Sequence, residues 1–466
     1  MTTRRSTLLI LPILCVHLIL LQLTRFTLWP EMVTYPFLIN HGFLLYKDLI
    51  NPYPPLLSSV LAVFTRVFGY SPNNYKLLTW SLILTIDVLI YHLAGKIFKS
   101  NRNALVSTAI FALLSIPFGV NGLWFDLVQT PLVIISVFLL YKYLDDKSQT
   151  KLIFWTLLSL TIGFFIKQQI IWLVIWLASV VILKSRYKLK SLSRKLHLFL
   201  LPFVLIIAVC LFISKSQGTA KDFLFWVFYF PFFKASGMPG YISLPSPREL
   251  LVTMSIFLLF IPTLLKRRFD EIFFVLSGII LSTFAYPRFD YFHLIPSVAV
   301  LSLAAGPNIK NLAKSNLLTK STILILGLFL LVFTGRFIIR NPNNQARFFE
   351  DDIYRGAANL KSITSLSDVI YMQNNPGQIL VLANRLPPKP WADEFPWYLE
   401  LPGEQEKIID AIILQNPKYV VFKPYDNGQV YDLGVYRPAK VADYLDSHYQ
   451  NLTQISDTLW LKARKE

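Results

Sequence analysis

Apolar runs recur along the first 340 residues of the chain, and many are long enough to cross a lipid bilayer. A membrane-crossing helix needs about 20 mostly apolar residues, because lipid offers no hydrogen bonds to an open backbone. Only 15% of the 466 residues are charged, against about 25% in soluble proteins. The sequence therefore predicts a polytopic α-helical membrane protein. We expect about eleven transmembrane helices, near residues 6–28, 76–98, 104–120, 128–144, 152–166, 169–183, 198–214, 249–265, 272–286, 292–306 and 321–338.

The basic residues indicate which loops face the cytoplasm. The chain has a net charge of +18, and its Lys and Arg residues gather in alternate loops between the apolar runs. One such loop, residues 184–197, has six Lys or Arg and no acidic residue. Because basic loops stay in the cytoplasm, we expect a multi-pass protein of the cell membrane with a cytoplasmic N-terminus and an extracytoplasmic C-terminal segment. A nucleic-acid partner is not expected, since these cations do not form one soluble basic face.

The last part of the chain has a different character. Residues 341–466 hold 13 Lys and Arg against 16 Asp and Glu, and they lack long apolar runs. We predict strands in "GQILVLAN", "KYVVFKP" and "DTLWLKA", and helices in "EQEKIIDAIILQN" and "KVADYLDSHYQNL". The sequence thus predicts two domains: a membrane region at residues 1–340, and a small extracytoplasmic α/β domain at residues 341–466.

Several motifs are absent from the sequence, and their absence narrows the function. There is no GxxxxGK[ST] phosphate loop, no GxGxxG, no HExxH zinc motif and no Asp-x-Asp pair. An ATP-driven pump and a soluble nucleotide-sugar enzyme are therefore not indicated. The two cysteines, Cys15 and Cys210, lie inside apolar runs and read as small hydrophobic residues.

A polar, proline-broken loop follows the first apolar run, at about residues 29–75. Its stretch "EMVTYPFLINHGFLLYKDLINPYPPL" carries Glu31 and Asp48, and Pro54 and Pro55 precede the amphipathic run "LLSSVLAVF". A carboxylate just beyond a helix end can take a proton from a hydroxyl or hold a divalent cation. The alternative interpretation is an ordinary solvated loop acid.

This loop resembles the first outward loop of the GT-C glycosyltransferases, especially their protein mannosyltransferase and aminoarabinose transferase members. The resemblance rests on a W-x-E pattern, a G-x-x-x-Y-x-D turn, a Pro-Pro-Leu stretch and a closing Phe-Gly, at Gly42, Tyr46, Asp48, Pro54, Pro55, Leu56, Phe68 and Gly69. Three further stretches are similar to the family: "GLWFDLVQTPLVII", "GFFIKQQIIWL" and "YPRFDYFHLIPSVAVLSLAAG". Together these motifs span most of residues 1–306.

The resemblance implies a GT-C-type fold and an inverting transfer of a sugar from a polyprenyl-phosphate donor to an extracytoplasmic glycan, lipid or protein. It implies Glu31 as the general base. The donor phosphate would be held by Lys167, Arg288 and His293, and the acceptor or a metal by Asp126, Tyr53 and Gln168. Lys167 and Arg288 could equally be membrane anchors. The sequence indicates no certain cofactor, and a divalent metal ion at the acids stays open.

One departure from the family leaves the base open. Pro30 and Glu31 stand where the family usually has Asp-Glu. Either Glu31 serves alone, or Asp48 takes the role, or the chain is an inactive relative that acts as a scaffold.

A transporter or flippase of lipid-linked or small polar substrates is the alternative function. Its support is Asp87, which lies within the apolar run "LILTIDVLIYHL", where an ionisable group is costly. Asp87 would be a proton relay in a transporter, or it would make a buried structural hydrogen bond. The sequence shows no repeat of one half in the other, which many transporters have.

The aromatic stretch "KDFLFWVFYFPFF", residues 221–233, predicts a segment in contact with membrane lipids. It would lie beside the entry of a lipid donor or serve as a plain anchor.

Overall fold

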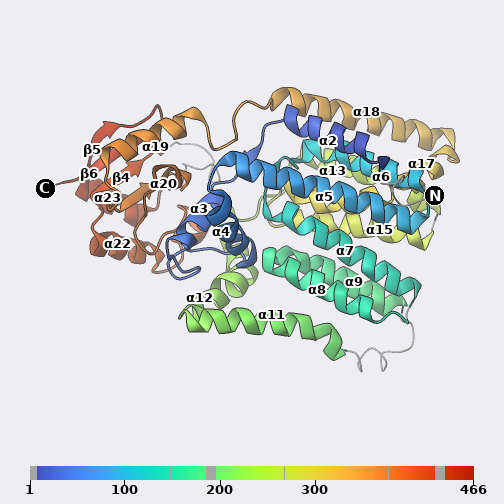
Figure 1. Ribbon diagram of the computed structural model, residues 1–466, viewed down its shortest axis with the longest axis horizontal. Coiled ribbons are helices and arrows are strands. Elements are labelled where there is room, and N and C mark those ends of the chain that lie inside the picture. The colour runs from blue at the N-terminus through green and yellow to red at the C-terminus, as the bar shows by residue number, and fades with distance from the viewer. Residues whose placement is uncertain are drawn as a thin grey trace. The chain divides into compact units, whose positions relative to one another are not determined.

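The computed structural model describes residues 8–146, 148–184, 196–266, 268–375, 377–425 and 436–465 (Figure 1). The chain forms two compact units. The first unit comprises residues 1–26, 76–210 and 243–344, and the second comprises residues 27–75, 211–242 and 345–466. Most of the basic loop at residues 184–197 lies outside the described residues.

The first unit is built almost wholly from helices. Its main elements are α2 (Leu11–Leu23), α5 (Pro72–Phe98), α6 (Asn101–Leu114), α7 (Phe125–Asp145), α8 (Lys151–Ile166), α9 (Ile171–Lys184), α11 (Leu196–Ser216), α13 (Pro247–Leu258), α14 (Ile261–Lys266), α15 (Phe269–Leu281), α16 (Ile295–Leu303), α17 (Ala305–Ala313) and α18 (Leu317–Arg340). Four short 3-10 helices and one short strand lie between them: η1 (Ile116–Phe118), β2 (Gly122–Leu123), η2 (Gln168–Ile170), η5 (Ser282–Ala285) and η6 (Tyr291–Leu294). Two helices, α5 and α11, each extend a few residues beyond this unit.

Among the described residues, three helices are long and apolar enough to cross a membrane: α5, α7 and α18. The pair Tyr291–Leu303 and Ala305–Ala313, bent by 56°, could form a fourth span. The predicted count of about eleven spans is not confirmed. Several expected spans are shorter apolar helices, such as α2 with 13 residues and α8 with 16. At about 1.5 Å per residue they reach only about 20–24 Å, less than a bilayer core of about 30 Å.

Local signals in the sequence set where these helices begin. Ser246 accepts a hydrogen bond from the backbone of Glu249, whose side chain bonds back to Ser246, and this capping box starts α13. Asn316 caps α18, because its side chain accepts a hydrogen bond from the backbone amide of Thr319. In the interior of the unit, α7 packs beside α8 and α16. These contacts bring the start of α7, the end of α8 and the turn before α16 close together.

The second unit combines the opening loop with the C-terminal residues. Its elements are β1 (Thr27–Leu28), α3 (Glu31–Asn40), α4 (Leu56–Phe68), α12 (Ala220–Leu224), η3 (Phe225–Lys234), η4 (Ala235–Gly237), α19 (Asp351–Ile363), β3 (Ile370–Gln373), α20 (Gln378–Ala383), α21 (Pro396–Leu399), α22 (Glu404–Gln415), β4 (Tyr419–Phe422), α23 (Ala439–His448), β5 (Tyr449–Gln454) and β6 (Trp460–Arg464). The predicted domain boundary at 340/341 is near the change of unit at 344/345, but this unit also takes in the opening loop.

The amphipathic run after the two prolines forms α4, as predicted. It begins at Leu56 and ends at Phe68, and the next residue is Gly69, whose φ of 77° is readily adopted only by glycine. Leu57 and Leu61 are buried, whereas Val63 and Val67 on the other side are exposed. The exposed apolar side is consistent with the predicted position at a membrane surface, which stays a prediction.

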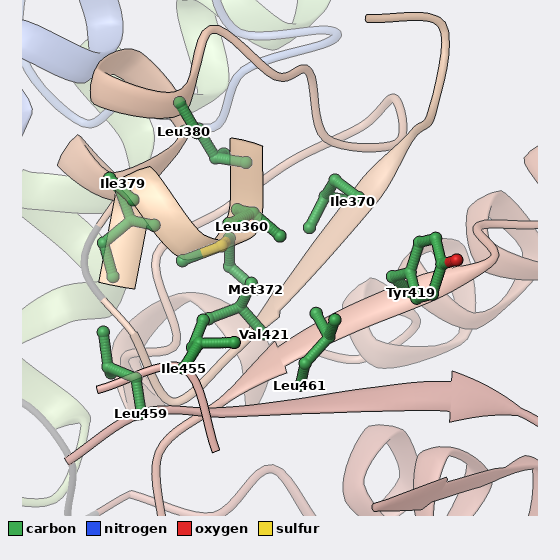
Figure 2. Packing of buried hydrophobic residues seen from close by; sticks show 12 residues of the cluster. Leu360, Ile370, Met372, Ile379, Leu380, Tyr419, Val421, Ile455, Leu459 and Leu461 are labelled. Carbon is green, nitrogen blue, oxygen red and sulfur yellow. The ribbon is translucent and has the colours of Figure 1, made fainter. Parts of the chain in front are cut away.

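A four-stranded sheet forms the centre of the C-terminal residues, with the strand order β3-β4-β6-β5. β3 runs parallel to β4, and the other two pairs are antiparallel. Figure 2 shows the core against one face of the sheet, where α19 contributes Leu360, α20 contributes Ile379 and Leu380, and the strands contribute Met372 and Val421. The α/β character expected for this region is therefore seen, because apolar side chains from both helices and strands share one core.

Two local predictions in this region are wrong. The strand predicted at residues 377–384 is replaced by the helix α20 (Gln378–Ala383), since a short, continuously apolar run has no periodicity that separates a helix from a strand. The end of the predicted last helix, residues 449–452, lies in strand β5, which pairs with β6. The first part of that predicted helix is confirmed as α23, and the other predicted strands and helix are confirmed as β4, β6 and α22.

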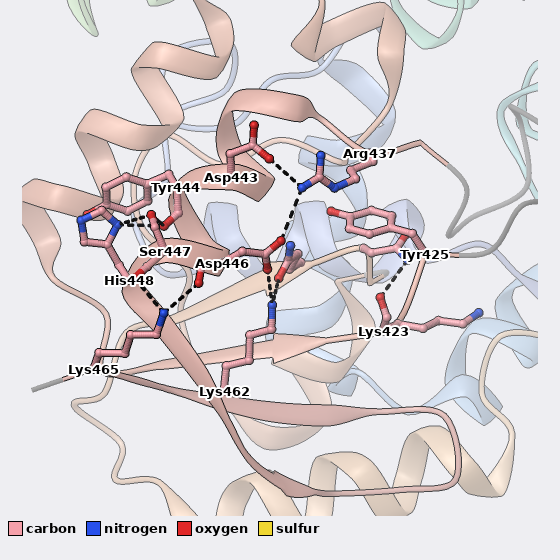
Figure 3. A network of polar contacts seen from close by, with 12 residues as sticks. Lys423, Tyr425, Arg437, Asp443, Tyr444, Asp446, Ser447, His448, Lys462 and Lys465 are labelled. Atoms are coloured by element: carbon pink, nitrogen blue, oxygen red, sulfur yellow. Dashed lines mark hydrogen bonds and ion pairs between the residues drawn. The ribbon is translucent and has the colours of Figure 1, made fainter.

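Polar contacts fasten α23 to the sheet (Figure 3). Lys462 on β6 donates to Asp446 on α23 at 2.9 Å and to Gln373 on β3 at 3.0 Å. Arg437 also donates to Asp446, at 3.4 Å, and Lys465 donates to the backbone oxygen of the same residue. Asp446 thus gathers three cationic side chains and holds the helix in place.

Candidate active site

The first acid of the opening loop lies at the start of a helix. Glu31 is the first residue of α3, outside the membrane-spanning helices, and Tyr35 lies one turn later. Residues four apart in a helix lie on the same face, so both side chains leave α3 on one side. The start of a helix carries partial positive charge, which suits a carboxylate.

A C-terminal segment pairs with the same loop through its backbone. The Ile50 amide donates to the Trp391 carbonyl at 3.1 Å, and the Trp391 amide donates to the Asp48 carbonyl at 2.9 Å. Asp393 follows two residues later and is nearly fully buried. The Tyr35 hydroxyl donates to the Asp393 Oδ2 at 2.7 Å. The fold therefore brings a third acid, distant in sequence, to the face of α3 that carries Glu31.

The electrostatics of this cluster favour protonated carboxyls. Burial, and then the negative charge of Asp393, raise the pKa of Glu31 well above its usual range. Burial also raises the pKa of Asp393, while the hydrogen bond from Tyr35 opposes that shift. The Glu31 Oε2 is buried and finds no hydrogen-bond partner among the residues that the structure describes. We call Glu31, Tyr35 and Asp393 the acid cluster; its acids exchange a proton nearer to neutral pH than ordinary carboxyls do.

Aromatic side chains surround the acid cluster. Tyr398 is buried and interacts electrostatically with Tyr53, Asp393 and Glu31. Its ring contacts those of Trp226 and Phe230, at centroid distances of 6.0 and 6.1 Å. The aromatic stretch 221–233 thus packs one side against the C-terminal residues. Other members, such as Phe233, are exposed, and their contact with lipid stays a prediction.

The second acid of the loop, Asp48, has a different environment. Its Oδ2 accepts from the Leu44 amide at 3.1 Å and lies 3.6 Å from the Lys389 Nζ, which also donates to the Gly42 carbonyl. Asp48 therefore holds a tight turn in place. Tyr53 lies just beyond this turn, where its carbonyl accepts from the Tyr46 hydroxyl at 3.1 Å.

In the first unit, three of the predicted site residues form one buried cluster. The Asp126 Oδ2, at the start of α7, lies 2.7 Å from the Lys167 Nζ and 2.8 Å from the His293 Nδ1. Lys167 directly follows the last residue of α8, and its Nζ lies 3.2 Å from the His293 Nδ1. The Gln129 side chain donates to the Lys167 carbonyl at 2.6 Å and fixes the backbone there. We call Asp126, Lys167 and His293 the buried triad.

The two remaining predicted residues lie nearby in the chain. Gln168 follows Lys167 in η2 and is buried. Arg288 lies on the turn before η6, where the backbone on both sides of it pairs with Ser243. The charged groups that interact with Asp126 are Lys167 and His293.

The charges of the buried triad bear on the metal hypothesis. Asp126, the acid proposed for a metal, is already paired with a lysine. Within the described ranges, no group of three or more His, Cys, Asp or Glu side chains is arranged to hold a metal ion.

The mid-span acid, Asp87, makes a structural contact. Its Oδ2 lies 2.7 Å from the His17 Nδ1, and the other ring nitrogen of His17 lies 3.4 Å from the Ser115 Oγ. All three side chains are fully buried. The pair links α5 to α2, so Asp87 makes the buried hydrogen bond that was one of its two predicted roles.

Comparisons with known proteins identify the architecture. A family model described as dolichyl-phosphate-mannose-protein mannosyltransferase matches residues 52–213. Two crystal structures of ArnT from Cupriavidus metallidurans, one bound to undecaprenyl phosphate and one in the apo state, each match with a TM-score of 0.62 and 11% identity. The match to the bound form covers 99% of this chain and 98% of that one. The chain has the GT-C fold.

The oligosaccharyltransferase of Archaeoglobus fulgidus is a more distant structural match. Its TM-score is 0.53 at 10% identity, over 100% of this chain and 74% of that one. No curated protein sequence matches the chain. The resemblance to GT-C glycosyltransferases inferred from the sequence is thereby confirmed. The GT-C fold and the family match together support a membrane glycosyltransferase.

The sequence analysis predicts only one member of the acid cluster, Glu31. It does not predict Tyr35 and Asp393, or the neighbouring Tyr398, as site residues. A signal was present, because Asp393 lies in "WADEFPWY", where acids are embedded among large aromatic residues. Aromatic neighbours of this size indicate burial, and a buried acid is a candidate site residue because burial shifts its pKa.

Proposed function

We propose that this chain is an integral membrane glycosyltransferase that moves a sugar from a polyprenyl-phosphate donor to a hydroxyl of an extracytoplasmic acceptor. The GT-C fold supports this, as does the family match, whose description names a lipid-phosphate-linked mannose. One of the ArnT structures holds undecaprenyl phosphate, a lipid of the proposed donor class. The observation that carries the proposal is the buried Glu31 carboxyl, which has a raised pKa and an oxygen without a partner among the described residues.

In the proposed reaction, Glu31 takes the proton from the acceptor hydroxyl. The acceptor oxygen forms a bond to the anomeric carbon, and the bond from that carbon to the phosphate oxygen breaks. The electron pair leaves with the lipid phosphate, so one displacement inverts the anomeric centre. A base whose pKa lies nearer to neutral pH suits this step, because it binds the proton more firmly than an ordinary carboxylate does.

Cationic residues of the first unit are proposed to bind the donor phosphate. Lys167 and His293 form charge-assisted hydrogen bonds with Asp126, and a phosphate would engage the same donors. In this proposal, Asp126 holds both side chains in position until the donor arrives. We keep Arg288 as a further phosphate ligand, and Tyr53 and Gln168 as acceptor contacts.

Glycosyl transfer is favoured over transport because the residue that suggested transport has a structural partner. Asp87 is paired with His17 inside the first unit. Its position within an apolar helix therefore needs no proton pathway.

A donor panel tests the proposal. Purified protein in lipid is incubated with polyprenyl-phosphate sugars of different sugar identity and with candidate acceptor hydroxyls. We expect release of free polyprenyl phosphate with at least one donor. A transporter would move the intact lipid-linked sugar across a vesicle membrane without cleaving it, so translocation with no release from any donor would contradict the proposal.

A further inference from the structure

We propose that Asp393 is a positioning residue for Glu31, and that the two carboxyls and the Tyr35 hydroxyl act as one proton-sharing unit. This inference rests on the proposed function, in which Glu31 is the base. It assigns a role in the reaction to the C-terminal residues of the second unit.

The geometry begins with the backbone. The reciprocal hydrogen bonds between the opening loop and Trp391 fix the position of the chain two residues before Asp393. The Trp391 ring also packs edge-on against the Tyr35 ring, at a centroid distance of 6.3 Å. Tyr35 in turn donates to Asp393 at 2.7 Å. Asp393 is thus held from two sides, so its carboxylate has a defined place next to α3.

The charges explain what this placement does. The negative charge of Asp393 raises the pKa of the Glu31 carboxyl. The negative charge of Glu31 in turn contributes to the raised pKa of the Tyr35 and Tyr398 hydroxyls. Two carboxylates in one buried site repel each other, so the ionised Asp393 favours a proton on Glu31. When an acceptor hydroxyl gives up its proton, this repulsion strengthens the affinity of Glu31 for it.

The neighbouring acid, Glu394, provides a contrast. It accepts hydrogen bonds from the Tyr371 and Tyr425 hydroxyls at 3.1 and 3.2 Å and from the Asn374 amide at 3.0 Å. Burial raises the pKa of Glu394 to about 7. Glu394 is therefore a buried acid in the same segment with other partners, which makes it a matched control.

The test is the pH dependence of turnover in Asp393→Asn. Asparagine still accepts from Tyr35 but carries no charge, so Glu31 should ionise at lower pH. We expect the rising limb of the kcat profile to move to lower pH by about one unit, the size of a like-charge effect on a carboxyl. We also expect kcat on the plateau to fall about tenfold, with KM nearly unchanged. In Glu394→Gln, the rising limb of the kcat profile should stay at the same pH as in the wild type.

A second variant, Tyr35→Phe, tests the same inference if Asp393→Asn fails to fold. Tyr35→Phe keeps both acids and removes only the hydroxyl that stabilises the ionised Asp393. Asp393 then holds its own proton to higher pH, and the limb should move in the same direction by a smaller amount. An unmoved limb in both variants would overturn the inference, and so would an equal shift in Glu394→Gln.

A readout without turnover separates this inference from the proposed function. A hydrophobic carbodiimide modifies protonated buried carboxyls, and peptide mass spectrometry measures the modified fraction of Glu31 against pH. In the wild type, modification should persist to higher pH than in Asp393→Asn. Such a shift in a protein that transfers no sugar would support the coupling of Asp393 to Glu31 and refute the proposed glycosyltransferase function. Transfer with identical modification profiles would refute the coupling alone.

Discussion

At the scale of the residue, Glu31 makes stability depend on pH in a direction that can be worked out. Its pKa in the folded protein is raised above the ordinary value of 4.5, so the folded state binds this proton more tightly than the unfolded state. The resulting stabilisation is complete below the ordinary value and is lost as the pH rises through the raised value. Glutamine carries no titrating proton. We therefore expect the melting temperature of Glu31→Gln to fall less than that of the wild type between pH 5 and 9, and parallel curves would contradict the assigned pKa direction.

The buried triad allows its structural role to be separated from a role in donor binding. Lys167→Met leaves Asp126 buried without its cation, which typically costs about 3–5 kcal/mol. The double variant Asp126→Asn with Lys167→Met removes both charges and should recover most of the melting temperature. If Lys167 binds the donor phosphate, affinity for a polyprenyl-phosphate sugar stays weak in the double variant. Recovery of both stability and affinity would reduce Lys167 to a structural residue.

At the scale of the element, the contact between α3 and α20 sets the position of the acid cluster. A Cβ atom added at Gly377 would lie 2.4 Å from the Thr34 Cγ2 and 2.9 Å from its Oγ1. Thr34 lies between Glu31 and Tyr35 on α3. We expect Gly377→Ala to destabilise the protein by about 1–3 kcal/mol, as overpacking does, and to lower turnover.

A pair of controls makes this prediction specific. Thr34→Ala removes the atoms that an added methyl would meet, so it should restore the stability of Gly377→Ala in the double variant. Gly237→Ala adds a methyl group with no atom within 4 Å and should be neutral. Thermal unfolding measures all four proteins. Equal losses in Gly237→Ala and Gly377→Ala would contradict the contact.

The elements show how far the sequence alone could predict this fold. Helices with long apolar runs or caps, such as α18, were predictable, because their signals are local. The helix α20 was not, because its apolar run "ILVLA" lacks the periodicity that separates a helix from a strand. Asp393 was missed for a related reason: its neighbourhood is created by backbone pairing between residues more than 300 positions apart in the sequence.

At the scale of the whole molecule, the alternation of basic loops predicts a topology that labelling can check. In a variant with Cys15 and Cys210 replaced by serine, single cysteines are placed at Ser148, in the loop after the predicted span 128–144, and at Ser447, in the C-terminal residues. Both sites are exposed, and the predicted topology places the first in the cytoplasm and the second outside. A membrane-impermeant thiol reagent added to intact cells should label Ser447→Cys and leave Ser148→Cys unmodified until the cells are opened. The reverse pattern would place Glu31 on the cytoplasmic side and contradict the proposed reaction.

The central claim is that the Glu31 carboxyl is the base of a glycosyl transfer, and the turnover of Glu31→Gln tests it most directly. Glutamine keeps the shape of the side chain and removes the base, so we predict a loss of about 100-fold or more in kcat, with donor binding retained. Asp48→Asn is the comparison: its partly exposed ion pair with Lys389 contributes about 1 kcal/mol or less, so its kcat should stay within about fivefold of the wild type. An active Glu31→Gln beside an inactive Asp48→Asn would move the base to Asp48, and normal transfer by both variants would contradict the mechanism.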